Sequence, residues 1–414
     1  MFKNTENAYT KCGCFFMRKF IRIGDAVLAA VCAVILAFVA IGNALLPDTL
    51  IRYENDGDQL TAFYSCTATS TQSVDYQKGA SSEETLRFLH TVPVKQVKVT
   101  SKQTGTVYVS GEVFGIKLYT DGVIVVGTQS VDLGGGETAN PAADAGIQVG
   151  DILVAIDDRP VYSAGEVTDI LNENNGLSYS VRLKRDGRYK TFELTPAYSP
   201  REGSYKAGLW VRDSTAGIGT VTFYNAENGT FASLGHPIND VDTNELMPLL
   251  EGEAVSAEVT NVQRAGTGST GSLWCDFKSD TKGTLTENTD CGLYGAYQSL
   301  PATAEPVPVA SRQEVKKGGA QILSTVEGTE PQLYDIEITK ISYNKEGEQK
   351  DIVFKVTDPA LLAKTGGIVQ GMSGSPILQN GKLVGAITHV IVNHPEKGYA
   401  IFAQTMYEKS RTLG

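Results

Sequence analysis

The chain has 414 residues, of which 41% are hydrophobic and 20% are charged, so it is a folded protein long enough for two to three domains. Its 43 glycines favour many short strands and tight turns, which predicts a mainly β fold. The formal net charge of −11 leaves no basic surface for phosphate groups, which excludes nucleic acid as a partner.

The first long apolar segment is residues 26–46, AVLAAVCAVILAFVAIGNALL. A helix of this length crosses a hydrocarbon core of about 30 Å. Basic residues precede it and an acidic body follows, so the positive-inside rule places residues 1–25 in the cytoplasm and the rest on the extracytoplasmic side. A cleaved signal peptide is the alternative, but its apolar core is usually only about 7–15 residues long. We therefore expect a single transmembrane anchor.

Six cysteines are spread along the chain, at positions 12, 14, 32, 66, 275 and 291. Cys12 and Cys14 have no second cysteine pair or histidine nearby, so no metal site is expected. Cys275 and Cys291 could form a disulfide in an exported domain, and free buried thiols are the alternative.

Residues 47–102 are polar and mixed, with Ser, Thr and Gln clusters such as residues 67–73. They predict a linker that is open to proteolysis. Within it, alternating apolar and polar residues at Val94–Val99 predict one strand. His90 lies in this segment and is expected to have a structural role.

Residues 103–198 have the pattern of a compact module. Strand-like residues 113–118 and 123–126 precede a helix that begins at Ser163, where Glu166 has the spacing of a capping box. Asp186-Gly187 predicts a two-residue hairpin turn near the end of the module.

The run PAADAGIQVGDILVAID in this module, with VFGIKL before it, resembles the PDZ domains of bacterial proteases. The resemblance implies a loop whose backbone N–H groups bind a peptide carboxylate, while the peptide adds a strand to the sheet edge. On this sequence the loop is Val113, Phe114, Gly115 and Ile116, and the groove lies between this strand and the helix from Ser163. A structural β-module without a ligand is the alternative.

Residues 199–414 predict strands almost throughout, for example at 217–224, 258–263 and 336–343. Asn380-Gly381 predicts a hairpin turn. Many short strands over this length are typical of a pair of packed β-barrels.

Ser373 stands out in this region, in the run Gly-Met-Ser-Gly-Ser-Pro at 371–376. Flanking glycines allow a serine hydroxyl to stand clear of its backbone, as a nucleophile requires. The alternative hydroxyl, Ser375, is followed directly by proline. The glycine at 371 suggests that the N–H groups of Gly371 and Ser373 form an oxyanion hole.

A serine nucleophile needs a histidine as general base, and the chain has four histidines. His236 lies in a turn between Gly235 and Pro237, which favours it as the base. His389 and His394 lie in or just past the hairpin strand that follows the serine, where a structural role is expected.

SLGHPIND around His236 and TDPALLAKTGGIVQGMSGSPILQNGKLVGAITHV around Ser373 resemble the stage IV sporulation protein B peptidases. The order of anchor, PDZ domain and peptidase domain also agrees with this family. The resemblance implies a chymotrypsin-like double β-barrel with Ser373 as nucleophile, His236 as base and Asp358 as the acid that orients the histidine. It also implies export into the space between the two membranes of the forming spore.

Asp358 has a second interpretation, because it is followed by proline and a short helical pattern that ends at Gly366. Asp at the N-cap and Pro at the first helical position are typical helix-start signals. Asp240 and Asp242, just after His236, are the competing candidates for the acid.

We therefore expect a membrane-anchored serine endopeptidase of sporulation that needs no metal or cofactor. Its expected targets are its own linker and a membrane-associated regulator of sigma-factor processing, and the PDZ groove is expected to bind a peptide or a protein C-terminus. The alternative is a catalytically inactive, membrane-anchored PDZ adaptor with a degenerate protease fold.

Overall fold

The computed structural model describes residues 27–44, 48–53, 64–68, 81–102, 105–301, 305–342 and 349–413. The predicted cytoplasmic segment, with Cys12 and Cys14, lies outside the described residues. The chain divides into two units, residues 1–104 and 105–414, which are described separately.

In the first unit, the apolar segment forms the helix Val27–Ala44. It is long and apolar enough to cross a membrane, and most of its side chains are exposed to their surroundings. A helix that was the core of a soluble domain would bury these side chains. This agrees with the prediction of a single-pass anchor near the N-terminus.

The prediction of a linker for residues 47–102 is wrong, because this stretch contains a four-stranded sheet in the order β1-β4-β3-β2. The predicted strand at Val94–Val99 is confirmed within β4. Six buried side chains form a small core: Tyr64, Cys66, Leu86, Phe88, Val97 and Val99. The sheet was missed because β1 pairs in parallel with β4, a partner far along the chain. The strands are β1 (Thr49–Tyr53), β2 (Tyr64–Ala68), β3 (Ser81–Phe88) and β4 (Val92–Lys102).

In the second unit, the first barrel is a ring of six strands in the order β6-β17-β18-β19-β16-β15, and β15 pairs back with β6. Four of its strands are 15 to 18 residues long, well above the usual five or six. The ring comprises β6 (Val113–Thr128), β15 (Leu209–Asn225), β16 (Thr230–Ser233), β17 (Leu249–Gln263), β18 (Ser272–Thr289) and β19 (Gly292–Tyr297). The short strands β5 (Thr106–Val109) and β20 (Pro306–Pro308) extend the sheet beside β15.

The second barrel is closed by six strands in the order β21-β22-β23-β26-β25-β24. Alternate residues point into its core, as Ile352, Phe354 and Val356 do on β23. The predicted hairpin turn at Asn380-Gly381 joins β24 and β25, with φ angles of 53° and 75°. The elements are η2 (Arg312–Glu314), β21 (Gly318–Ser324), β22 (Gln332–Ile341), β23 (Ile352–Val356), α4 (Pro359–Thr365), β24 (Pro376–Gln379), β25 (Lys382–Ile391), β26 (His394–Phe402) and α5 (Ala403–Arg411).

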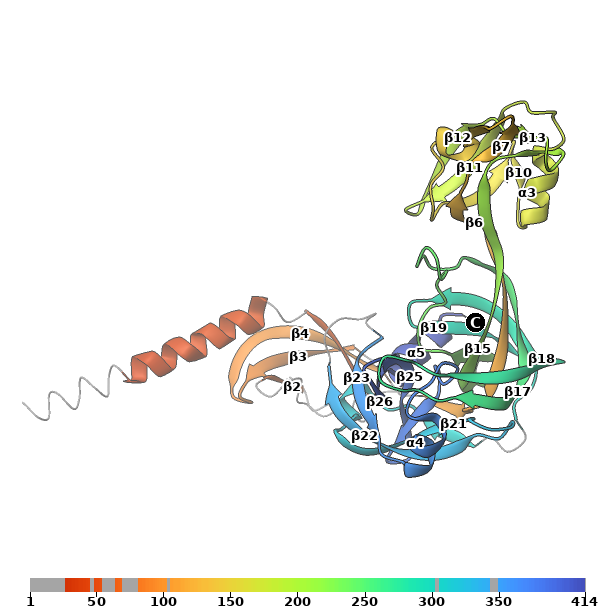
Figure 1. Ribbon diagram of the computed structural model, residues 1–414. Coiled ribbons are helices and arrows are strands. Elements are labelled where there is room, and N and C mark those ends of the chain that lie inside the picture. The colour runs from red at the N-terminus through yellow and green to blue at the C-terminus, as the bar shows by residue number, and fades with distance from the viewer. Residues whose placement is uncertain are drawn as a thin grey trace, which may run out of the picture. The chain divides into compact units, whose positions relative to one another are not determined.

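The PDZ domain is formed between β6 and β15, and Figure 1 shows its elements gathered at the far end of β6. The capping box of Ser163 and Glu166 starts α3 as predicted, and Asp186-Gly187 turns between β11 and β12. Its elements are β7 (Val131–Gly134), β8 (Glu137–Ala139), α2 (Pro141–Asp144), β9 (Ile152–Ile156), β10 (Arg159–Pro160), α3 (Ala164–Leu171), β11 (Tyr179–Arg185), β12 (Arg188–Leu194), β13 (Ala197–Ser199) and β14 (Ser204–Lys206).

The predicted domain borders at residues 103 and 198 differ from the structure. β6 and β15 each run from the first barrel into the PDZ domain, where β6 pairs with β9 and β15 pairs with the last residues of β6. The residues 113–119 therefore belong to the barrel, and residues 209–213 belong to the PDZ sheet. The sequence pattern does not reveal this, because a continuous strand that serves two cores has no break in its composition.

Candidate active site

Residues 370–375 lead into β24 and carry Ser373, the expected nucleophile, so they are named the nucleophile loop. Gly371 and Gly374 both have positive φ angles, +99° and +95°, which favour glycine. A Cβ at position 374 would lie 2.0 Å from the backbone oxygen of Thr220. The two glycines beside Ser373 are thus required by the shape of the loop.

Both barrels hold this loop. From the first barrel, the Thr220 hydroxyl donates to the Gly371 carbonyl at 2.9 Å, and the Thr220 N–H donates to the Ser373 carbonyl at 2.9 Å. From the second barrel, the Gly374 N–H donates to the Ile387 carbonyl at 2.8 Å. Since these bonds occupy carbonyl oxygens on both sides of the serine, the backbone of the loop is held in one orientation.

Ser375, the alternative nucleophile, is fully buried. Its hydroxyl donates to the Ser324 hydroxyl at 2.8 Å inside the second barrel. Ser373 is only half-buried and lines a cavity of about 770 Å³. Only Ser373 of the two is placed to meet a substrate.

The N–H groups of Gly371 and Ser373 have no hydrogen-bond partner among the described residues. Buried backbone N–H groups are nearly always paired, so two free ones beside an accessible hydroxyl are unusual. They are separated by one residue in the loop and lie on either side of Met372. This arrangement is suited to stabilising an oxyanion.

His236 follows β16 in a turn where Leu234 and Gly235 have φ angles of 65° and 70°. Its Nδ1 lies 2.8 Å from the carbonyl oxygen of Pro237. A carbonyl can only accept, so Nδ1 carries the proton and Nε2 is the free base. Burial lowers the pKa of His236, and the bond to Pro237 offsets this in part. The imidazole is therefore neutral at pH 7, as a general base must be.

His236 and Ser373 line the same cavity, which brings together the two residues singled out in the sequence. In the structure, the Ser373 hydroxyl donates to the Thr388 carbonyl at 3.0 Å rather than to His236. Catalytic hydrogen bonds are often loose before substrate binds. Transfer of the proton to His236 thus requires a rotation of the serine side chain.

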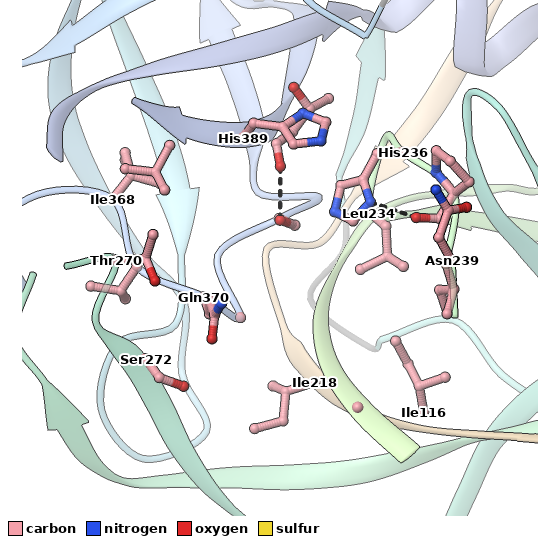
Figure 2. Close-up of a pocket in the computed structure, with 18 of the residues that line it drawn as sticks. Ile116, Ile218, Leu234, His236, Asn239, Thr270, Ser272, Ile368, Gln370 and His389 are labelled. Carbon is pink, nitrogen blue, oxygen red and sulfur yellow. Dashed lines mark hydrogen bonds between the residues drawn. The ribbon is translucent and has the colours of Figure 1, made fainter. Parts of the chain in front are cut away.

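His389 is a residue of this site that sequence reasoning assigned to a structural role. Its ring centroid lies 5.0 Å from that of His236, and Figure 2 shows the two rings together at one side of the cavity. Burial, His236 and Lys350 lower the pKa of His389 to about 4. Its Nδ1 is buried without a partner among the described residues. The sequence around His389 has no motif that indicates a functional residue, because its ring meets His236 only when β25 packs in the folded chain.

The rest of the cavity is uncharged. Figure 2 shows Ile116 and Ile218 on the side away from the histidines, with Gln370 and Ser272 at the left. No Asp, Glu, Lys or Arg lines it among the described residues. The cavity is therefore suited to apolar or small polar side chains.

Asp358 does not lie in this cavity. It is the N-cap of α4, where its carboxylate accepts from the N–H groups of Ala360 and Leu361 at 2.9 and 3.0 Å. The other oxygen accepts from the Asp335 N–H at 3.4 Å. None of its hydrogen bonds goes to His236, so the structure supports the capping interpretation of this residue.

The competing acids, Asp240 and Asp242, both pair with Arg212. Asp240 is buried, and it also accepts from Thr243 and from the Asp242 N–H. Burial alone would raise the pKa of Asp240, but these hydrogen bonds together lower it. Both residues build the loop after His236, and neither is hydrogen-bonded to the imidazole.

One further expectation is not met. Val113, Phe114, Gly115 and Ile116 do not form a peptide-binding loop, because they lie in β6 between β15 and β17. Their strand neighbours on both sides leave no free edge for a peptide.

Of the two alternatives for Cys275 and Cys291, a disulfide or free thiols, the structure has free thiols.

Comparisons with known families match two parts of the chain. Residues 203–407 match the family described as SpoIVB peptidase S55, and residues 136–185 match the family described as PDZ domain. Among solved structures, the crystal structure of the PDZ domain of the SdrC-like protein from Listeria monocytogenes is 23% identical to this chain. That match covers 22% of this chain and 87% of that chain, with a TM-score of 0.18.

Proposed function

Because residues 203–407 belong to the SpoIVB peptidase S55 family, we propose that this chain is a membrane-anchored serine endopeptidase with Ser373 as nucleophile and His236 as general base. The observation that carries the proposal is one cavity lined by both side chains. The two free N–H groups of Gly371 and Ser373 beside it support acyl transfer as the reaction.

In the proposed mechanism, the Ser373 Oγ attacks the carbonyl carbon of the substrate while its proton passes to Nε2 of His236. The negative oxygen that forms accepts from the N–H groups of Gly371 and Ser373. The histidine then gives its proton to the leaving amine, and a serine ester remains. Water, deprotonated by His236, hydrolyses the ester and restores the free serine.

The Nδ1–H of His236 already donates to the Pro237 carbonyl, which sets the tautomer that this mechanism needs. A carboxylate is the usual partner at that position, and a neutral carbonyl stabilises the imidazolium less. The contacts of Asp358 do not support a role as the acid of a triad; they favour a role in positioning the nucleophile loop. It starts α4, and α4 leads through Gly366 into the nucleophile loop.

For substrates, we propose protein segments near the membrane, since the helix Val27–Ala44 holds the enzyme there. The uncharged cavity supports uncharged side chains next to the cleaved bond. We further propose cleavage of the chain's own residues 47–102 and of a membrane-associated regulator of sigma-factor processing, on the extracytoplasmic side. The PDZ match supports binding of a peptide or protein C-terminus.

A fluorophosphonate probe tests the proposal, because it reacts only with an activated serine. Labelling of the full chain that is lost in Ser373→Ala is the expected result. Mass spectrometry of the N-terminus should show trimming within residues 47–102 in the native chain and none in Ser373→Ala. Identical trimming in both proteins would refute self-cleavage.

The alternative function is an inactive PDZ adaptor, and one observation favours it: the Ser373 hydroxyl donates to Thr388 rather than to His236. An adaptor would bind peptides with no labelling of Ser373. The probe experiment therefore separates the two functions.

A further inference from the structure

β15 has one edge without a partner over more than half its length. Its first edge pairs with β6 from Leu209 to Thr220. Beyond Thr220, β5 continues this first edge, and on the second edge β16 pairs only with residues 221–225. Among the described residues, no strand covers this second edge between Leu209 and Gly219. Such an edge presents N–H and C=O groups with which an extended polypeptide can pair.

At the PDZ end, α3 is hydrogen-bonded to the free stretch and to the segment just before it. The N–H of its first residue, Ala164, donates to the Asp213 carboxylate at 2.9 Å. Its C-cap residue, Asn172, accepts from the Tyr205 N–H at 2.7 Å, just before β15 begins. A helix beside an open edge strand is the setting in which PDZ domains receive a peptide strand.

The hydrogen bonds at the start of β15 show which groups point outward. The Gly208 carbonyl accepts from the Gln129 N–H at 2.9 Å, on the β6 side. In an antiparallel ladder, hydrogen-bonded pairs alternate with pairs that point their N–H and C=O away. Leu209, opposite Thr128, therefore turns its N–H and C=O to the free edge.

At the other end, the same edge enters the active-site cavity. Thr215, Ala216, Gly217 and Ile218 line the cavity together with Ser373 and His236. Two residues further on, the Thr220 N–H is bonded to the Ser373 carbonyl. One strand edge thus leads from the PDZ domain to the nucleophile.

The direction of β15 decides in which orientation a substrate strand lies on this edge. β15 runs from the PDZ domain to the cavity, so an antiparallel strand runs from the cavity to the PDZ domain. Its C-terminus then lies at Gly208 and Leu209, and its upstream residues lie at Ile218. These positions are ten residues apart, or about 33 Å in an extended strand.

We propose that a substrate pairs with β15 as one continuous antiparallel strand, with its free C-terminal carboxylate at Gly208–Leu209 and the bond to be cleaved about ten residues upstream, at Ser373. The occupant is thus the C-terminal stretch of the peptidase's own substrate. Bulges at Trp210/Val211 and Arg212/Ser214 bend the edge, so the optimum spans a few residues. This inference rests on the proposed peptidase function.

The test uses the full chain in detergent and peptides that share one cleaved segment. Their extensions from the cleaved bond to the C-terminus are about 4, 7, 10, 13 and 20 residues, each as free acid and as amide. We expect kcat/KM to peak near the third peptide, about tenfold above the shortest, and the peak to vanish on amidation. A flat series, or a peak that amidation leaves unchanged, overturns the inference.

A variant pair adds a second test. Leu209→Pro removes the outward N–H without removing a bond to β6, whereas Leu209→Ala keeps this N–H. The ratio of kcat/KM between the third and the shortest peptide should fall to about one in Leu209→Pro and persist in Leu209→Ala. An unchanged ratio in Leu209→Pro contradicts the inference. If this variant does not fold, the amide comparison on the unmodified chain decides.

The two proposals fail in different ways. If no peptide is cleaved faster than by Ser373→Ala, the peptidase function itself is refuted. If the shortest peptide is cleaved but length and carboxylate have no effect, only the shared strand edge is refuted.

Discussion

The two barrels of the peptidase region differ in how they are closed. All six strands of the second barrel come from residues 318–402, and none is longer than ten residues. The first barrel uses strands of up to 18 residues, and two of them leave the ring to enter the PDZ domain. The second barrel carries Ser373, whereas His236 comes from the first.

The difference shows how the site is divided. Ser373, the proposed nucleophile, lies in a loop of a compact barrel made of one continuous stretch of chain, which favours a rigid loop. His236, the proposed base, lies on the barrel whose strands continue into the PDZ domain. A peptide bound along β15 therefore contacts the barrel of the base, while the serine is held by bonds from both.

The largest expected effect comes from removing the nucleophile of the second barrel. Ser373→Ala should lower kcat/KM by at least about 10⁴-fold, because no acyl-enzyme can form. Ser375→Ala is the matched control, since it lies two residues away and its hydroxyl faces Ser324. We expect it to cost about 1 kcal/mol of unfolding free energy and to keep cleavage. If cleavage is lost in Ser375→Ala but not in Ser373→Ala, Ser375 is the nucleophile.

The hold of the first barrel on the nucleophile loop is tested by Thr220→Val. The change keeps the side-chain shape but removes the bond to the Gly371 carbonyl, so the oxyanion donors lose their orientation. We expect kcat to fall about tenfold to hundredfold, with KM nearly unchanged. Peptide hydrolysis under saturating substrate measures this. An unchanged kcat would show that the second barrel alone sets the loop.

The role of Asp358 is tested by comparing two substitutions. If it caps α4, Asp358→Asn should keep kcat within about threefold, because Asn is an equally good N-cap. Asp358→Ala should then lose about 1 kcal/mol of stability, measured by denaturant unfolding. If it is instead the triad acid, both variants would lose activity by about 10⁴-fold.

The smallest effect concerns pH. The pKa values of His236 and His389 are lowered in the folded chain, to about 4 for His389, so the unfolded chain binds more protons below pH 6.5. The free energy of unfolding is therefore highest above pH 6.5 and falls as the pH drops toward 4. Unfolding temperatures across this range should fall less in His389→Gln than in the native chain. Equal slopes would show that other groups dominate.

Much of the site was visible in the sequence because its signals are local. Gly371 and Gly374 mark the turn around Ser373, and Gly235 and Pro237 mark the turn at His236. The capping pattern at Asp358 also predicted its observed contacts. His389 had no such signal, since its place beside His236 depends on pairing between strands that are distant in sequence.

The sequence by itself determined the apolar helix, the mainly β composition, the α3 capping box, the hairpin turns and the serine and histidine motifs. These depend on neighbouring residues, whose conformations and hydrogen bonds are set within a few positions. Only the tertiary structure decided that residues 48–102 contain a sheet, that residues 113–116 lie inside a barrel strand, and that β15 serves two domains. Strand pairing joins distant segments through backbone groups that every residue carries, so side-chain patterns do not specify it.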